Sequence, residues 1–167
     1  AQQEVDQGQV AELAAQRGAA EQQLSTNAEQ IADLEDQLAE VNRQLFVATQ
    51  AFNFTKAEYD VDRYSFEVRR EDAHAEAQDD DVHEVEGEEA VTARYEQWVV
   101  EGLEVERLTA ERDRLRAEIG VFNAEVDAIA GELSLLTGES ERLQGLVADL
   151  QPTLVDNYLL NAPLLDF

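Results

Sequence analysis

The chain of 167 residues contains no cysteine and no methionine, and it has only two prolines. The absence of cysteine excludes disulfides, cysteine-ligated zinc and covalent haem attachment through a CxxCH motif within this chain. Few prolines mean few helix breakers, which favours long helices. No apolar run approaches the roughly 20 residues that a membrane span needs, so the sequence predicts no span.

Positive charge is scarce as well: 12 basic residues stand against 38 acidic ones, which gives a formal net charge of −26. Such a chain would repel phosphate, so the composition argues against binding to nucleic acid and against docking on an anionic membrane surface. Lys56 is the only lysine. An acidic, lysine-poor surface indicates a protein that works in high salt, where screening reduces self-repulsion. An ordinary acidic coiled coil rich in arginine is the alternative.

The most regular feature of the sequence is an apolar seam in its second half, broken at Arg112 and Ser140. The seam consists of Val105, Leu108, Leu115, Ile119, Phe122, Val126, Ile129, Leu133, Leu136, Leu143, Val147 and Leu150. Steps of three and four residues indicate a helix with the narrow apolar face of a coiled coil. Such a face needs a partner helix.

A similar seam runs through the first half of the chain, with Arg17 and Asn27 at two of its positions. It consists of Val10, Leu13, Ala20, Leu24, Ile31, Leu34, Leu38, Val41, Leu45, Ala48 and Phe52. A polar residue in a seam costs stability but can fix the register of the two helices. The first half can therefore supply the partner that the second half needs.

The fold class that these seams predict is all-α, a long antiparallel helical hairpin or coiled coil over residues 1–151. We expect helices at about 4–76 and 88–151, joined by an acidic turn at about 77–87. Residues 152–167 would form a short helical or irregular apolar tail, because Pro152 ends the second helix or starts a new turn.

The register predicted for the hairpin follows from a turn centred near residue 80. This places Tyr59 opposite Gly102, a large group opposite a small one, as interdigitated packing prefers. A shift of one heptad would satisfy the seams nearly as well.

Aromatic residues crowd the end of the first helix on more than one face, at Phe46, Phe52, Phe54, Tyr59, Tyr64 and Phe66. They need cover on more than one side and form either a partner-binding surface or part of the hairpin core. We expect this patch to meet Tyr95 and Trp98 of the second helix. The residues predicted to bind partners are Phe46, Phe54, Tyr64, Tyr95 and Trp98, together with Tyr158, Leu159, Leu160, Leu164, Leu165 and Phe167 of the tail.

Side chains with metal-ligand character gather in the acidic turn, at Asp79, Asp80, Asp81 and His83. Their spacing is not that of an EF-hand loop. A solvated acidic loop and weak binding of a divalent cation both fit this segment. The sequence shows no nucleophile–base pair, phosphate loop or cofactor fingerprint, so it predicts a protein that is not an enzyme and holds no cofactor in this chain.

Two stretches resemble segments of large membrane-anchored bacterial c-type multihaem cytochromes: FTKAEYDVDRY at 54–64 and NAPLLDF at 161–167. In that family a membrane helix leads into a long helical region, and CxxCH motifs follow. This sequence has neither a CxxCH motif nor a predicted span, so the resemblance implies the helical part only, as a fragment or a subunit with haem elsewhere in the assembly. It further implies a periplasmic or extracytoplasmic location, with other protein subunits, c-type cytochromes among them, as partners.

The function that we predict is that of a non-enzymatic structural or interaction module. It would dock to partner proteins through its aromatic residues and its apolar tail, in an electron-transfer assembly according to the resemblance. The alternative is a free-standing homo-oligomeric coiled coil, acting as a spacer or fibre component of a halophile or phage-type structure.

Overall fold

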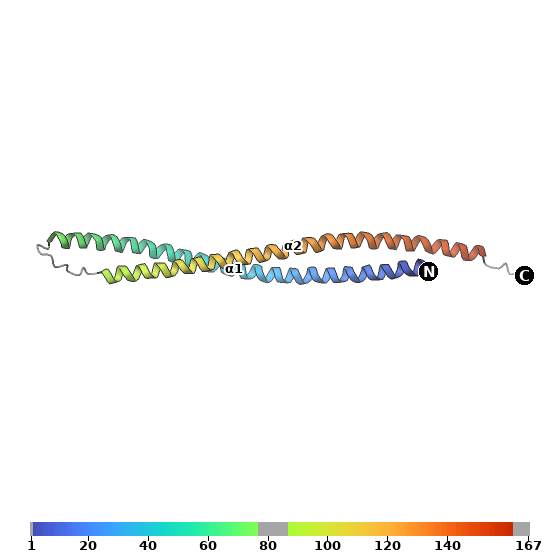
Figure 1. Ribbon diagram of the computed structural model, residues 1–167, viewed down its shortest axis with the longest axis horizontal. Coiled ribbons are helices and arrows are strands. Elements are labelled where there is room, and N and C mark those ends of the chain that lie inside the picture. Colours follow the sequence, from blue (N-terminus) through green and yellow to red (C-terminus); the bar gives the residue numbers. More distant parts are fainter. Residues whose placement is uncertain (1, 77–86, 162–167) are drawn as a thin grey trace, which may run out of the picture. The chain divides into compact units, whose positions relative to one another are not determined.

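The computed structural model describes residues 2–76 and 87–161, with side chains for 4–75 and 87–149. Helix α1 spans Gln2–Glu76 and helix α2 spans Glu88–Asn161 (Figure 1). The two helices pack against each other, which confirms the predicted all-α helical hairpin. Neither described helix contains a stretch apolar enough to cross a bilayer.

The helix ends agree with the predicted ones except at the end of α2. Its backbone stays helical through Pro152 as far as Asn161, about ten residues beyond the predicted end. Proline lacks one backbone N–H and therefore removes one helical hydrogen bond. In this chain the loss does not stop the residues that follow from continuing the helix. The predicted turn at 77–86 lies outside the described residues.

Gly87 directly precedes the first residue of α2. Its φ of +105° lies in the left-handed region, which side chains other than glycine rarely adopt. Its carbonyl oxygen accepts a hydrogen bond from the N–H of Val91 at 3.0 Å. Glu88 and Glu89 follow in the first turn, where negative charge interacts favourably with the helix dipole.

The chain divides into two compact units, and each contains one segment from each helix. Unit 1 comprises Ala1–Asp33 and Ile119–Phe167, and unit 2 comprises Leu34–Glu118. Within each unit the two segments run antiparallel, because successive residues along α1 contact residues progressively closer to the start of α2. In unit 2, for example, Phe52 contacts Trp98 while Tyr59 contacts Tyr95.

Both predicted seams are confirmed by burial as far as the side chains are described, while the side chain of Leu150, the last predicted seam residue, lies outside the described set. Every seam position from Val10 to Phe52, and every one from Val105 to Val147, is buried or half-buried. Leu115 is fully buried, and Leu34, Leu108 and Leu143 are nearly so. Burial of such side chains contributes on the order of 1.5–3 kcal/mol each, which identifies the seams as the main source of stability.

Two polar residues within the seam of unit 1, Asn27 and Ser140, are also buried. Asn27 is 1 % exposed. Its side-chain amide accepts a hydrogen bond from Gln23 at 2.9 Å and donates one across to Glu125 of α2 at 3.4 Å. A buried amide that finds its partner on the facing helix favours one register over others, as predicted for this position.

The register of unit 2 differs from the predicted one by a single heptad. Gly102 lies against Phe52, seven residues before the predicted Tyr59. A shift by one heptad keeps every apolar position on the seam, so the seam alone could not choose between the two registers. The aromatic contacts around Gly102 distinguish them, because the ring of Phe52 fits over the glycine.

Candidate partner-binding surface

An inner aromatic cluster holds the two helices of unit 2 together. It consists of Phe52 and Tyr59 of α1 and Tyr95 and Trp98 of α2. The Trp98 ring stacks on Phe52 and on Tyr59, with centroids 5.7 and 5.9 Å apart. Tyr95 lies 5.5 Å from Tyr59 and meets Trp98 edge-on at 5.9 Å. Aromatic pairs in such geometries contribute about 0.5–1.5 kcal/mol beyond the area they bury.

Two further contacts fix the position of this cluster. Gly102 leaves room for Phe52, whose Cε2 atom would lie 3.0 Å from a Cβ placed on the glycine. Arg94 of α2 forms ion pairs with Glu58 and with Asp62 of α1, the second at 3.6 Å. These side chains are about one-third exposed, so solvent screens the ion pairs and their main effect is on register.

A second apolar face of α1 points away from the inner aromatic cluster, and we call it the outer stripe. It consists of Phe46, Val47, Phe54, Val61, Tyr64 and Val68, which are between 38 % and 70 % exposed. Four of these residues are spaced seven apart, from Val47 to Val68. At about 100° per residue, all six fall within roughly one-third of the helix circumference, on the side opposite Phe52 and Tyr59.

Charge is sparse and balanced around the outer stripe. Residues 44–57 contain one charged side chain, Lys56, and residues 43–70 contain five basic and four acidic side chains. Two acidic side chains here pair within the helix: Asp60 with Lys56 at 2.9 Å and Glu67 with Arg63 at 3.0 Å. The stripe therefore occupies a nearly neutral segment of a very acidic chain.

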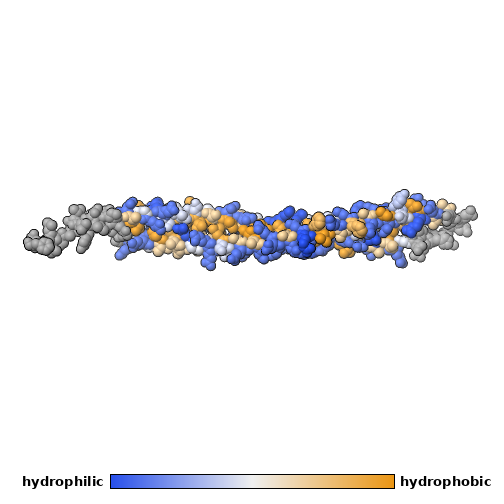
Figure 2. All heavy atoms as spheres, turned by 180° about the vertical axis from the view of Figure 1, so that it is seen from behind, coloured by the Kyte–Doolittle hydropathy of each residue, from blue (hydrophilic) through white to orange (hydrophobic). Residues whose placement is uncertain are grey.

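Helix α2 also exposes apolar side chains in unit 2, namely Tyr95, Val99, Val100 and Leu103. Tyr95 is 46 % exposed although two of its neighbours are aromatic rings. Figure 2 shows apolar residues exposed in patches among hydrophilic ones on the face that it draws. Exposed apolar area of this extent is typical of a protein interaction site.

The residues predicted to bind partners therefore divide into three groups. Phe46, Phe54 and Tyr64 lie on the outer stripe, whereas Tyr95 and Trp98 belong to the inner aromatic cluster. The tail residues Tyr158, Leu159 and Leu160 lie on the helical backbone of α2, but their side chains fall outside the described set. Leu164, Leu165 and Phe167 lie outside the described residues altogether.

Sequence reasoning missed the valines of the outer stripe, although a signal for them exists. The sequence pattern predicts that the aromatic residues cover more than one face, and the valines add to it a seven-residue repeat of Val47, Phe54, Val61 and Val68. This repeat shares the helix with the inner seam and is offset from it. One helix can therefore carry two heptad patterns, and a search for a single seam finds only the longer one.

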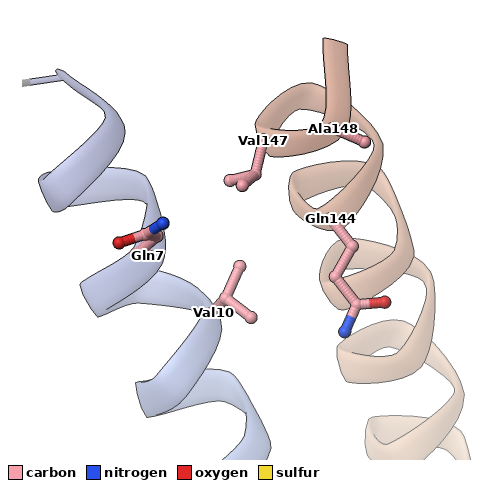
Figure 3. Close-up of a pocket in the computed structure, with 5 residues that line it drawn as sticks. All are labelled: Gln7, Val10, Gln144, Val147 and Ala148. Atoms are coloured by element: carbon pink, nitrogen blue, oxygen red, sulfur yellow. The ribbon is translucent and has the colours of Figure 1, made fainter. Parts of the chain in front are cut away.

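Unit 1 contains a shallow groove between the two helices, with a volume of about 230 Å³. Gln7 and Val10 of α1 and Gln144, Val147 and Ala148 of α2 line it, and Val10 and Val147 point toward each other across it (Figure 3). None of these side chains titrates or acts as a nucleophile. The groove therefore offers two amides and an apolar floor, which suit packing rather than catalysis.

Charged side chains on the surface form a recurring local pattern that the sequence analysis did not identify. A glutamate and an arginine three residues later pair at Glu40–Arg43, Glu104–Arg107, Glu111–Arg114 and Glu139–Arg142, with contacts of 2.5–2.7 Å. The hydrogen bond from the arginine lowers the pKa of each glutamate, and in Glu40 the pKa falls to about 2. These pairs support the helices locally.

In the part of the chain that the structure describes, no three His, Asp or Glu side chains converge on a common point where they could hold a metal ion. The predicted metal candidates Asp79, Asp80, Asp81 and His83 lie outside the described residues.

Comparisons of the chain with protein-family models, curated proteins and solved structures find no match. The resemblance to c-type cytochromes therefore stays a prediction.

Proposed function

We propose that this protein is a non-enzymatic helical module that binds another protein through the outer stripe. The observation that carries this proposal is the exposure of Phe46, Phe54 and Tyr64, at 63–70 %, on the face opposite the hairpin core. The inner aromatic cluster and the seams hold the hairpin together without these side chains. The outer stripe therefore has no evident role in the stability of the described chain.

Interface energetics supports this proposal. Burying apolar surface contributes about 25 cal/mol per Å², and aromatic side chains are enriched among the residues that contribute most to protein interfaces. A rigid helix also loses little conformational entropy on binding, because its backbone is already ordered. The stripe thus presents three aromatic anchors on a preformed support.

Photo-crosslinking in the native host tests this proposal. A photoreactive amino acid replaces Val61 on the outer stripe, and in a control variant it replaces Leu135, which is 78 % exposed but lies in unit 1. We expect a discrete protein adduct, identified by mass spectrometry, from position 61 and none from position 135. Absence of any adduct at position 61 would contradict the proposal.

The cellular setting that we propose is an electron-transfer assembly outside the cytoplasm, with haem on other subunits. Its support is the resemblance of residues 54–64 and 161–167 to multihaem cytochromes. The first of these stretches includes Phe54, Val61 and Tyr64, so it coincides with part of the proposed interface. Absorbance spectra and haem staining of the assembly purified from its native source test the setting, and an assembly free of haem would contradict it.

A further inference from the structure

The partner that best fits the outer stripe is a second copy of the chain. We propose that two copies dock stripe against stripe, with their α1 helices antiparallel, in a symmetric dimer of hairpins. This inference rests on the proposed function, because it names the partner of the same surface. The spacing of the apolar side chains, the local charge and the exposed area each support it.

The spacing of the stripe is self-complementary when the two α1 helices run antiparallel. With a two-fold axis between residues 55 and 56, Phe54 of one copy meets Ala57 of the other, and Tyr64 meets Val47. Ala57 is exposed on the same face of α1. Each pairing sets a large side chain against a smaller one, as interdigitated packing requires. The seven-residue repeat adds a further layer on each side, in which Val61 meets Gln50 and Val68 meets Arg43, so the apolar pairings lie at the centre of the contact.

Local charge distinguishes this face from the rest of the chain. Across the chain as a whole, a net charge of −26 opposes contact between two copies. Residues 43–70, with five basic and four acidic side chains, carry almost no net charge. The antiparallel arrangement places the acidic segment 58–62 opposite the uncharged segment 49–53, whereas a parallel arrangement in register would place 58–62 against itself. Like charges facing each other would weaken the contact.

The area of the outer stripe is sufficient for a dimer. A large aromatic side chain presents roughly 200 Å² when fully accessible, so the six exposed side chains offer about 600 Å² per copy. Complete burial of these side chains in two copies would remove roughly 1,200 Å² from solvent, the lower end of the range for specific protein interfaces. Flanking residues add to this total.

Sedimentation equilibrium of the full chain in about 0.5 M salt, where the Debye length is below 8 Å, tests the proposal. We expect a dimer with micromolar dissociation, and we expect Phe54→Glu to weaken it at least tenfold. The control is Leu135→Glu, which removes a similarly exposed apolar side chain and adds the same charge in unit 1; it should dimerise like the wild type. Circular dichroism of each variant establishes that the helices are intact.

Two outcomes would overturn this proposal. One is a wild-type chain that stays monomeric at about 100 μM, and the other is a dimer that Phe54→Glu leaves unchanged. Either result would leave the proposed function standing if photo-crosslinking at Val61 still yields an adduct with a different protein. If that adduct is absent as well, the proposed function also fails, so the two failures are distinguishable.

Spin labels test the antiparallel orientation, since the chain has no cysteine and a single introduced cysteine is unique. Asn53 and Arg70 are both exposed and do not belong to the outer stripe. With 1.5 Å of rise per residue, we expect labels at position 53 of the two copies to lie within about 20 Å. Labels at position 70 should lie roughly 45 Å apart. Short distances at both positions would indicate a parallel dimer and overturn the antiparallel proposal.

Discussion

Replacing Gly102 by alanine should fail to stabilise the protein, unlike the same change elsewhere in α2. Alanine in a helix interior is ordinarily favoured over glycine by about 1 kcal/mol. At Gly102, however, the new Cβ would lie 3.0 Å from Cε2 and 3.5 Å from Cδ2 of Phe52. That ring is stacked on Trp98, so it cannot move away without losing the contact.

The expected magnitude follows from these two opposing effects. Overpacking of a well-filled site costs about 1–3 kcal/mol, so the net effect of Gly102→Ala lies between zero and about 2 kcal/mol of destabilisation. Gly120 has nothing within 4 Å of its would-be Cβ, so Gly120→Ala should stabilise by about 1 kcal/mol. Urea denaturation followed by circular dichroism, at a fixed protein concentration, measures both changes.

A double variant separates the clash with Phe52 from other effects at Gly102. Phe52→Leu removes the ring, so Gly102→Ala should be better tolerated in this background than in the wild type. If Gly102→Ala stabilised the wild-type chain as much as Gly120→Ala does, Phe52 would not lie against Gly102. The register of unit 2 described above would then be wrong.

Three further variants or conditions probe the capping of α2, the surface ion pairs and the net charge. Gly87→Ala should lower the thermal midpoint because a φ of +105° is strained for alanine by about 1–2 kcal/mol. The control Gly8→Ala places its new Cβ in open space and should raise the midpoint. Equal shifts of the midpoint in the two variants would contradict the positive φ of Gly87. The pKa of Glu40 falls from 4.5 to about 2, so its ion pair contributes above pH 4.5 and its contribution is lost as the pH falls toward 2. Glu40→Gln should therefore be less stable than the wild type at pH 7 and about equally stable near pH 2. A difference in stability that persisted at pH 2 would show that it does not come from the ion pair of Glu40. Raising the salt from about 0.1 M to 1 M shortens the Debye length from about 10 Å to 3 Å, so the thermal midpoint should rise; an unchanged midpoint would also contradict the prediction of a salt-adapted protein.

The seams and most helix ends could be predicted from the sequence because they depend on local periodicity. Each seam position from Val10 to Phe52 is apolar or one of two recognised exceptions, Arg17 and Asn27, and all are at least half-buried. The end of α2 could not be predicted in the same way. The sequence predicts that α2 ends at Pro152 or that a new turn starts there, whereas the helix continues to Asn161. Proline removes one backbone N–H, and the sequence pattern alone does not show whether the following residues continue the helix.

Register and surface could be predicted only in part, because both depend on contacts between helices. Shifting one helix by a heptad preserves every apolar match, so the choice of Phe52 over Tyr59 for Gly102 required the geometry of the rings. The sequence indicates that the aromatic residues are too many for one face of the helix. Their division into Phe52 and Tyr59 inside and Phe54 and Tyr64 outside became clear only once the position of α2 was known.

The most direct test of the hairpin, on which the outer stripe depends, is a distance within one chain. Spin labels at Ala51 of α1 and Val100 of α2, both exposed positions of unit 2, would be measured after tenfold dilution with unlabelled chain. We predict a separation below about 20 Å that survives dilution, because helices in contact lie about 8–10 Å apart. A separation near 75 Å, which 49 residues of continuous helix would give at 1.5 Å each, or a short distance that dilution abolishes, would contradict the account.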